Sequence, residues 1–333
     1  MIPRSRKHPV PAAKWFFALF LIAGVCWLAG LAAAEEGGSG HYLPGSMASF
    51  VDGVPLKETF IVRANVVNYN GNINAKKPIP IGGRTTLGAD AISWAYGLSL
   101  LWRPPVEIGK DWSYAMSATI PYVVMDVTAD VEAVAGNVSS AVSRSSSSNG
   151  LGDIVLMPLM LNYNVHPDFN VNFRMGIYAP TGDYKVGRLT NTGKNFWTFE
   201  PTLGLMYFGV NNGIEASVFT GLDFNTENPD TDYRSGTQFH VDGTLAQHFP
   251  LLGGLAGVGV NGFWYDQLTG DSGSGATYGD FEARTAGVGP VLSYAFKLGK
   301  VDMVAEAKWL HELDTTKRLE GDIVWFKGAF KFF

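Results

Sequence analysis

The chain is poor in cysteine. Its 333 residues include one, Cys26, which lies in an N-terminal apolar segment. We expect this segment to be removed on export, so that the mature chain carries no thiol. The sequence therefore excludes a disulfide scaffold, a thiol nucleophile and a thiolate metal site.

Charge and long apolar runs are also scarce. Charged residues make up 17% of the chain, whereas a typical soluble domain has about 25%. After Leu31 there is no run of about 18 consecutive apolar residues, so the sequence does not support membrane-spanning helices. The net charge of −5 gives no indication of a nucleic-acid partner. Glycine (40 residues) and aromatic residues (13%) are abundant, a combination typical of a membrane β-barrel.

The first 34 residues have the pattern of a secretory signal peptide. Basic side chains precede an apolar run over residues 15–31, and Ala32, Ala33 and Ala34 follow as a small-residue cleavage site. We predict export with cleavage near Ala34. An uncleaved membrane anchor is the alternative interpretation.

The alternation of side chains in residues 88–102 predicts a membrane strand. Successive side chains of a strand point to opposite faces, and here one face is large and the other small. The large face holds Ile92, Trp94, Tyr96, Leu98, Leu100 and Trp102, and the small face holds Ala91, Ser93, Ala95, Gly97 and Ser99. A soluble sandwich packs its large side chains inside, whereas a strand between lipid and an aqueous lumen has this pattern.

Similar alternation along the chain predicts a transmembrane antiparallel up-and-down β-barrel of about 12 strands. The expected strands are 57–68, 88–102, 112–126, 153–164, 170–179, 196–209, 214–225, 238–249, 257–267, 284–298, 301–313 and 322–333. Residues 131–150 are expected to form a serine-rich loop. Long polar connections are expected at 70–87, 127–152, 181–195, 226–237, 268–282 and 314–321, with short ones between them. Long external loops that alternate with short periplasmic turns are typical of outer-membrane barrels.

The sequence thus divides into three parts. Residues 1–34 are the signal peptide, residues 35–55 an N-terminal periplasmic or lumen-plugging segment, and residues 56–333 the barrel. The hypothesis that residues 35–55 fold into the lumen rests on their Gly and Pro content and their lack of periodicity. Unchanged planar-bilayer conductance after their deletion would contradict it.

Charged side chains collect on the strand faces that are expected to point inward. These lumen candidates are Arg63, Arg174, Glu200, Glu215, Asp223, His240, Asp242, Glu306, Lys308 and Lys327. They form either an ion-paired network that fills the barrel or a path for a small solute. A single His–Asp pair on one strand face does not predict a metal site, and we expect neither a metal nor a cofactor.

The last expected strand ends in aromatic residues. Outer-membrane barrels commonly end in such a strand, which the barrel-insertion machinery reads. Phe333 has the same parity as Lys327 and Lys331, so either the register slips at the end or Phe332 carries the signal. We expect outer-membrane lipid and the insertion machinery as partners.

The sequence predicts no catalytic residues, and we expect the protein not to be an enzyme. Among enzymes, an outer-membrane lipase is the alternative, because barrels of about this size can be lipases. Such a lipase needs a histidine two residues before its nucleophilic serine. None of the histidines after the signal peptide has serine at that offset; they are His41, His166, His240, His248 and His311.

Several motifs occur in a characteristic order and spacing. They are residues 41–45 (HYLPG), 178–182 (YAPTG), 231–236 (TDYRSG) with His240 and Asp242, 262–271 (GFWYDQLTGD), and Gly289-Pro290 with Tyr294. Through them the chain resembles the outer-membrane proteins of the meta-pathway of phenol degradation, also called the SphA family, over nearly the whole mature chain. The resemblance implies a barrel associated with uptake of aromatic or other hydrophobic compounds, and it brings no catalytic residues with it.

The motif residues lie at the ends of expected strands and in expected external loops. We take Tyr178, Tyr233, Trp264 and Gln267 as candidates for the rim of the barrel. They serve either the architecture of the loops or a rim site for an aromatic solute.

We therefore predict a porin-like barrel in the outer membrane of a Gram-negative bacterium. It is expected to allow the uptake or binding of small hydrophobic or aromatic compounds, with a small aromatic solute as the candidate ligand. A structural or adhesive barrel without transport is the alternative.

Overall fold

The computed structural model describes residues 40–73, 79–81, 84–135, 138–276 and 282–332. The predicted signal peptide lies outside the described residues. Within them, no helix is long and apolar enough to span a membrane. A short 3-10 helix, η2 (Phe50–Asp52), precedes the first strand, and the remaining described elements are strands.

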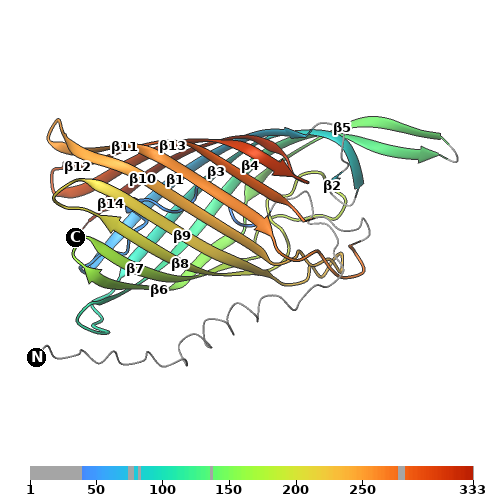
Figure 1. Cartoon of the computed structure of the whole chain (residues 1–333). Helices are drawn as coiled ribbons and strands as arrows, with labels where there is room; N and C mark the ends of the chain where they lie inside the picture. The colour runs from blue at the N-terminus through green and yellow to red at the C-terminus, as the bar shows by residue number, and fades with distance from the viewer. Residues whose placement is uncertain (1–39, 74–78, 82–83, 136–137, 277–281, 333) are drawn as a thin grey trace, which may run out of the picture. The chain divides into compact units, whose positions relative to one another are not determined.

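Twelve antiparallel strands of the described chain close into a barrel (Figure 1). In chain order they are β1 (Thr59–Ile73), β3 (Arg84–Arg103), β4 (Trp112–Ala135), β6 (Ile154–His166), β7 (Phe169–Ala179), β8 (Thr198–Phe208), β9 (Ile214–Asn225), β10 (Gln238–Leu251), β11 (Gly254–Gln267), β12 (Arg284–Leu298), β13 (Val301–Thr316) and β14 (Glu320–Lys331). Pairing of β14 with β1 closes the ring. Two further strands are not members of this ring: β2 (Ile79–Ile81) pairs with β3, and β5 (Val138–Leu151) pairs with β4.

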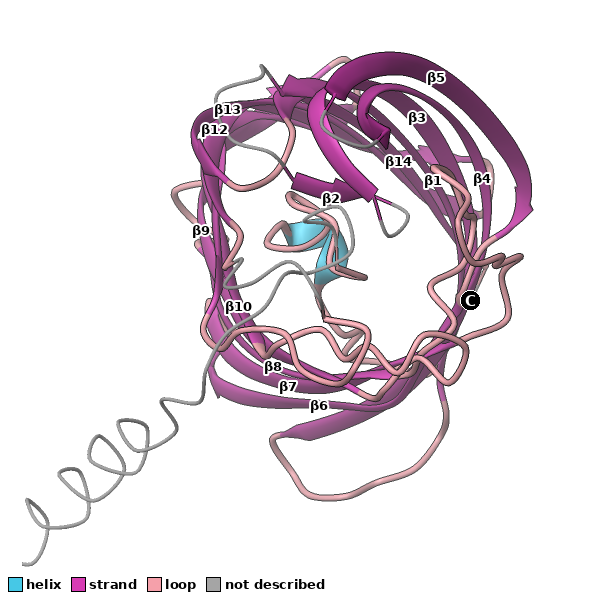
Figure 2. Ribbon diagram, turned by 90° about the vertical axis from the view of Figure 1, so that its right-hand side faces the viewer, coloured by secondary structure: helices cyan, strands magenta, loops and turns pink. Residues whose placement is uncertain are grey.

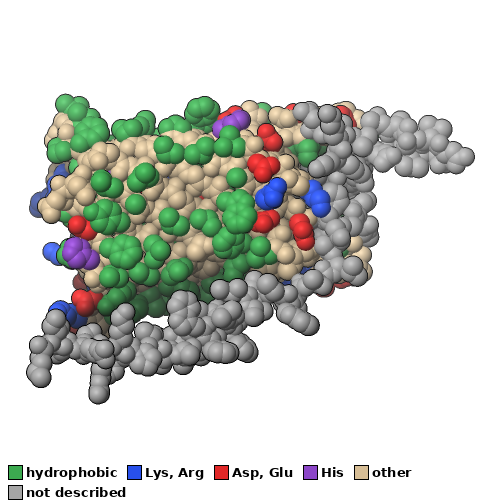
Figure 3. Space-filling model, viewed as in Figure 1, with side chains coloured by type: hydrophobic (Ala, Val, Ile, Leu, Met, Phe, Trp, Pro, Cys, Tyr) green, Lys and Arg blue, Asp and Glu red, His purple; other side chains and the backbone are tan. Residues whose placement is uncertain are grey.

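The predicted fold, an all-β transmembrane barrel of about 12 strands, is confirmed. Strand β3 shows the physical reason. Trp94 and Tyr96 are 39% and 45% exposed on the outer face, whereas Ala91 on the inner face is 6% exposed. Figure 3 shows apolar side chains spread over the barrel wall and charged ones toward its ends.

The described residues of the range 131–150 form strands, contrary to the loop predicted from their serine content. Strand β4 continues to Ala135, and β5 pairs antiparallel with this extension. The Ser147 hydroxyl donates to the Asp126 carboxylate across the pair. Backbone pairing orders the serine run, and composition does not reveal a pairing partner.

The connection predicted at 314–321 is also shorter than expected, because β13 and β14 extend into it and leave residues 317–319. A buried carboxylate fixes this turn. Glu312 accepts hydrogen bonds from the Gly321 backbone N–H at 2.8 Å and from the Tyr69 hydroxyl at 3.1 Å.

The two ends of the barrel differ in the length of their connections. At one end lie the long connections 180–197, 226–237 and 268–283, and at the other the short turns 209–213, 252–253 and 299–300. In outer-membrane barrels the long loops are extracellular and the short turns periplasmic. We call these the long-loop end and the short-turn end.

The inside of the barrel contains residues 40–55, which we call the lumen segment. Figure 2 shows helix η2 within the ring of strands. His41, near the start of the segment, contacts Thr198 at the long-loop end, whereas Phe50 packs against Phe208 at the short-turn end. The segment therefore runs along the lumen from the long-loop end to the short-turn end before β1 begins.

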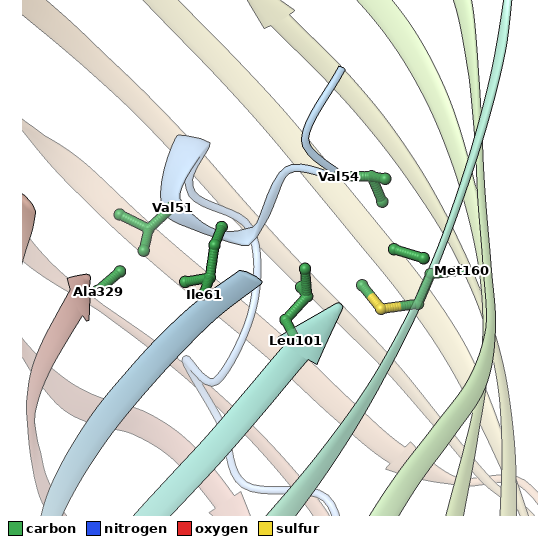
Figure 4. Packing of buried hydrophobic residues seen from close by; sticks show 7 residues of the cluster. Val51, Val54, Ile61, Leu101, Met160 and Ala329 are labelled. Carbon is green, nitrogen blue, oxygen red and sulfur yellow. The ribbon is translucent and has the colours of Figure 1, made fainter. Parts of the chain in front are cut away.

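Apolar contacts fix residues 51–54 of the lumen segment to the barrel wall (Figure 4). Val51 and Val54 belong to one buried cluster with Ile61, Leu101 and Met160, which come from β1, β3 and β6. Burial of such side chains stabilises a fold by about 1.5–3 kcal/mol each.

Candidate functional site

The ten predicted lumen residues all lie on the inner side of the wall. Arg63 is partly buried. The other nine are buried: Arg174, Glu200, Glu215, Asp223, His240, Asp242, Glu306, Lys308 and Lys327. Their part in the passage of a solute stays a prediction, but the structure shows what most of them contact, which is the lumen segment.

His41 makes the first contact, at the long-loop end. Its Nε2 atom lies 2.9 Å from Asp153 Oδ2, and its Nδ1 atom lies 2.7 Å from Thr198 Oγ1. Its ring stacks on Tyr178 with 4.8 Å between centroids. Burial lowers the pKa of His41 from 6.5 by more than the Asp153 carboxylate raises it.

Asp153 anchors this end of the segment from the loop before β6. Burial raises the pKa of its carboxyl group, but hydrogen bonds from His41 and from the backbone N–H groups of Gly182 and Lys194 outweigh burial and lower it overall. The two N–H donors lie 2.9 Å and 2.7 Å from the carboxylate oxygens. The ionised form is therefore the one that the site favours.

Tyr42 makes the second contact, deeper in the lumen. Its hydroxyl donates to Asp242 Oδ2 at 2.9 Å. Its ring stacks on the imidazole of His240 at 3.9 Å between centroids, and Tyr265 lies parallel at 6.0 Å. Asp242 also accepts the Gly45 backbone N–H at 2.8 Å, so one carboxylate holds both ends of the turn that follows Tyr42.

A turn at Gly45 brings backbone carbonyls to two lysines. Gly45 has φ +77°, and an added Cβ would lie 2.4 Å from the Leu310 side chain, so glycine is required here. Lys308 Nζ donates to the carbonyls of Gly45 and Met47, both at 3.1 Å. Lys327 Nζ donates to the carbonyl of Ser46 at 2.8 Å.

Asp52 is the charged centre of the segment. Lys327 Nζ lies 3.2 Å from Asp52 Oδ2, and Arg63 Nη1 lies 3.7 Å from Asp52 Oδ1. Arg174 donates to the Asp52 backbone carbonyl. Burial raises the pKa of Asp52, but the charges of Lys327 and Arg63 lower it more, and the carboxylate stays ionised.

Phe50 makes the last aromatic contact, near the short-turn end. Its ring lies 5.0 Å from the His248 ring and 5.8 Å from the Phe208 ring. Its backbone N–H donates to Glu215 Oε1 at 2.7 Å, while Glu215 Oε2 lies 2.7 Å from His248 Nε2. A hydrogen-bonded glutamate–histidine pair of the wall thus holds the first turn of η2.

Three buried side chains from the neighbouring strands β8, β9 and β10 meet inside the barrel. His240 Nε2 (β10) lies 3.3 Å from Glu200 Oε1 (β8) and 3.6 Å from Asp223 Oδ1 (β9). Tyr178 donates to the other Glu200 oxygen at 2.6 Å. One imidazole and two carboxylates at this spacing have the composition of a metal-ligand set.

The four rim candidates lie in three different places. Tyr178 faces the lumen beside His41. Tyr233 and Gln267 are buried and both bond to Asp271, which fastens two long loops together. Trp264 lies instead on the outer face, 41% exposed, where its ring contacts Phe239 at 5.6 Å.

The wall formed by β1, β3 and β4 has a different inner face. On β3 the inward side chains of residues 89–99 are small, and Ser93, Ala95 and Gly97 are partly exposed there, whereas Arg63 of β1 and Leu101 of β3 contact the lumen segment. Neighbouring polar groups bond to one another across strands: Asn65 donates to Ser99 at 3.2 Å, and the Ser99 and Thr119 hydroxyls lie 2.7 Å apart. This part of the wall satisfies its own polar groups.

Sequence reasoning missed the residues of the lumen segment that make these contacts. His41 and Tyr42 were noted only as part of a motif, and Asp52 was not singled out. The partners of His41 and Tyr42 lie more than 100 residues away in the sequence, which no local pattern encodes. The available signals were an aromatic residue, Tyr42, and an acidic residue, Asp52, in a segment without periodicity.

The sequence matches one protein-family model over residues 75–328, well over half of the chain. The description of that family is "Putative MetA-pathway of phenol degradation". No curated protein matches the sequence.

A solved outer-membrane channel has the same fold. The COG4313 outer membrane channel from Pseudomonas putida F1 superposes with a TM-score of 0.62 and 13% identity, over 88% of this chain and 100% of that one. At this identity the likeness shows the fold alone. A Pseudomonas aeruginosa FadL homologue (TM-score 0.37, 8% identity, 82% and 88% of the two chains) and the TodX deltaS2S3 mutant monoaromatic hydrocarbon channel (0.40, 8%, 84% and 91%) are more distant.

Proposed function

Because the chain belongs to this phenol-degradation family and folds as an outer-membrane channel barrel, we propose that it is a channel for small aromatic compounds whose lumen is closed by its own N-terminal segment. The observation that carries the proposal is the set of aromatic contacts between the lumen segment and the wall.

These contacts form three successive places along the lumen. The ring of His41 packs on Tyr178, that of Tyr42 on His240, and that of Phe50 on Phe208 and His248. The first two pairs are stacked, whereas Phe50 meets His248 edge-on and Phe208 at a tilt. Aromatic pairs of these kinds are worth about 0.5–1.5 kcal/mol beyond the burial of area. When the segment moves away, each place is free to take the ring of an aromatic solute.

The mode of attachment favours movement of the segment as a unit. Its main-chain carbonyls accept hydrogen bonds from Lys308, Lys327 and Arg174. A polar solute or water can replace such bonds at modest net cost, because each contributes about 0.5–1.5 kcal/mol, or about twice that with a charged donor. Residues 56–58 then connect the segment to β1 at the short-turn end.

We propose that the path runs between the segment and the wall of β1, β3 and β4. The inner faces of Ser93, Ala95 and Gly97 are partly exposed, and their small side chains leave room beside the segment. The polar groups of Ser99 and Thr119 line this side without requiring the segment as a partner. A flat apolar molecule with a polar substituent fits such a surface.

Uptake into proteoliposomes tests the function. The solutes are 4-hydroxybenzoate and its saturated counterpart, 4-hydroxycyclohexanecarboxylate, which share charge and polar groups and differ in the aromatic ring. We expect faster entry of the aromatic solute with the wild-type protein. Deletion of residues 35–55 should accelerate both solutes by about tenfold, since a barrel of this size then has a wider lumen.

Two results would contradict the proposal. One is uptake of both solutes at the rate of empty liposomes with both proteins, and the other is equal rates for the two rings in the wild type. If the deletion variant does not fold, a Val51→Cys/Ala329→Cys variant replaces it, because both residues belong to one buried cluster. Oxidation should then block uptake, and a reductant should restore it.

Export and insertion complete the proposal. We place the protein in the outer membrane after cleavage near Ala34, with the last strand as the element that the insertion machinery reads. Phe332 supports this role, since it is 50% exposed on the outer face and its backbone N–H donates to the Phe60 carbonyl at 3.3 Å.

A further inference from the structure

We propose that Glu200, Asp223 and His240 bind a divalent transition-metal ion of the zinc class inside the barrel. This site adjoins the aromatic places of the proposed solute path, because His240 also stacks on Tyr42 and Tyr178 donates to Glu200. The proposal does not depend on transport.

The geometry of the donor atoms supports a metal. Two ligands about 2.0–2.2 Å from a tetrahedral zinc ion lie about 3.4 Å apart. His240 Nε2 lies 3.3 Å from Glu200 Oε1 and 3.6 Å from Asp223 Oδ1. One donor atom from each residue lies within 4.8 Å of the others, so a single ion can reach all three.

The imidazole of His240 is fully buried and makes no well-formed hydrogen bond to a described residue. Its Nε2 atom instead faces the Glu200 and Asp223 carboxylates at 3.3 Å and 3.6 Å, an arrangement that a shared metal ion would complete. A buried polar atom without a partner is costly, and a bound ion removes that cost at Nε2.

Space next to Nε2 is kept open by a glycine. A Cβ added to Gly221, which lies opposite His240 on β9, would sit 2.4 Å from Nε2. Tyr42 does not block the site, because it stacks on the face of the imidazole, whereas a metal ion binds in the plane of the ring.

Charge also favours a dication. Two carboxylates with a neutral imidazole carry a formal charge of −2, which one divalent ion neutralises. The remaining Glu200 oxygen accepts from Tyr178, and Oε1 accepts from Thr202 at 3.0 Å, so outer groups orient this carboxylate. Since imidazole nitrogen is a poor ligand for Mg²⁺ and Ca²⁺, we expect selection for zinc-class ions.

Zinc content after refolding tests the site. Full-length mature protein is refolded into detergent with ZnCl₂ and excess Mg²⁺, then desalted, and the metal is measured by mass spectrometry. We expect about one zinc per barrel for the wild type and none for His240→Gln or Asp223→Asn. His248→Gln is the matched control, because His248 is equally buried beside one carboxylate, Glu215, but has no second one in the site described here.

A second measurement keeps the test decisive if the variants fail to fold. Wild-type protein refolded with Co²⁺ should show the visible absorption of a tetrahedral or five-coordinate ion. Folded wild-type barrel without zinc and without this absorption would overturn the proposal, and so would equal zinc in wild type and folded His240→Gln. In that case the three groups are an ion triad around a protonated imidazole.

Discussion

The inner wall of the barrel has two unlike halves. Strands β7 to β14 carry buried charges that are satisfied largely by the lumen segment: Lys308 and Lys327 donate to its carbonyls, and Asp242 accepts from Tyr42. On strands β1, β3 and β4, many inner residues are small and bond to one another, as Ser99 and Thr119 do, although Ile61, Arg63 and Leu101 near the short-turn end contact the segment. The charged half thus depends on the segment for partners along its whole length, whereas the small half contacts it near the short-turn end.

This difference bears on the proposed closure of the lumen. Charges without partners in a low-dielectric interior cost several kcal/mol each, so the charged half favours the docked segment. In the small half, Ser93 and Ala95 are partly exposed, whereas Ile61 and Leu101 hold the segment near the short-turn end. Substitutions in the two halves should therefore have opposite effects on transport.

The largest effect is expected from the charged half. Lys327→Met removes the group that bridges Asp52, Glu306 and the Ser46 carbonyl. Breaking such a buried pair costs about 3–5 kcal/mol, and here the cost falls on the docked state of the segment. We expect the open probability in planar bilayers to rise from near closed to mostly open.

Lys331→Met is the control for this substitution. Lys331 lies on the same strand, but its side chain is 38% exposed and reaches Asp302 only at 4.0 Å. Its conductance should equal that of the wild type. If the folded Lys327→Met barrel stays closed, the charged half is not the element that holds the segment.

An intermediate effect is expected from the small half. Ala95→Leu places a larger side chain on the partly exposed inner face, so uptake of the aromatic solute should fall about two- to fivefold. Ala64→Leu on the neighbouring strand makes the same change on the exposed outer face and should leave uptake unchanged. Equal uptake in the two variants would place the path elsewhere.

The smallest effect is expected from pH. The pKa of His41 is lowered in the docked segment, so below pH 6.5 the undocked state binds more protons and acid favours release. The docked state should lose at most about 1.4 kcal/mol per pH unit, which appears as a gradual rise in open probability from pH 7 to pH 5.

Two variants separate His41 from other groups in this titration. His41→Asn should flatten the rise, whereas His166→Asn, at an exposed histidine at the short-turn end, should keep it. Asp153 also has a lowered pKa and acts in the same direction, but its contribution is lost only below the range measured. An unchanged slope in His41→Asn would show that docking is not linked to this imidazole.

The strands and their inward faces could be predicted because they depend on a local rule. Alternation places Glu200 inward and Phe199 outward whatever the rest of the chain does, and the structure has them so. The same rule within β11 places Trp264 and Gln267 on opposite faces of the strand, because the two rim candidates have opposite parity.

The contacts between faces could not be predicted, because they depend on closure of the ring. Nothing local shows that Glu200, Asp223 and His240 meet, or that β5 pairs with an extension of β4. The match of Asp242 with Tyr42 across 200 residues likewise follows from the path of the segment through the lumen and not from spacing.

The course of the lumen segment sets an order of assembly. Pro44 accepts a hydrogen bond from the Trp325 indole, 281 residues later on the last strand, and Lys327 of the same strand holds Ser46. Pro44 and Ser46 can therefore make these contacts only after the last strand is in place. We expect docking of the segment to follow formation of the last strand during folding.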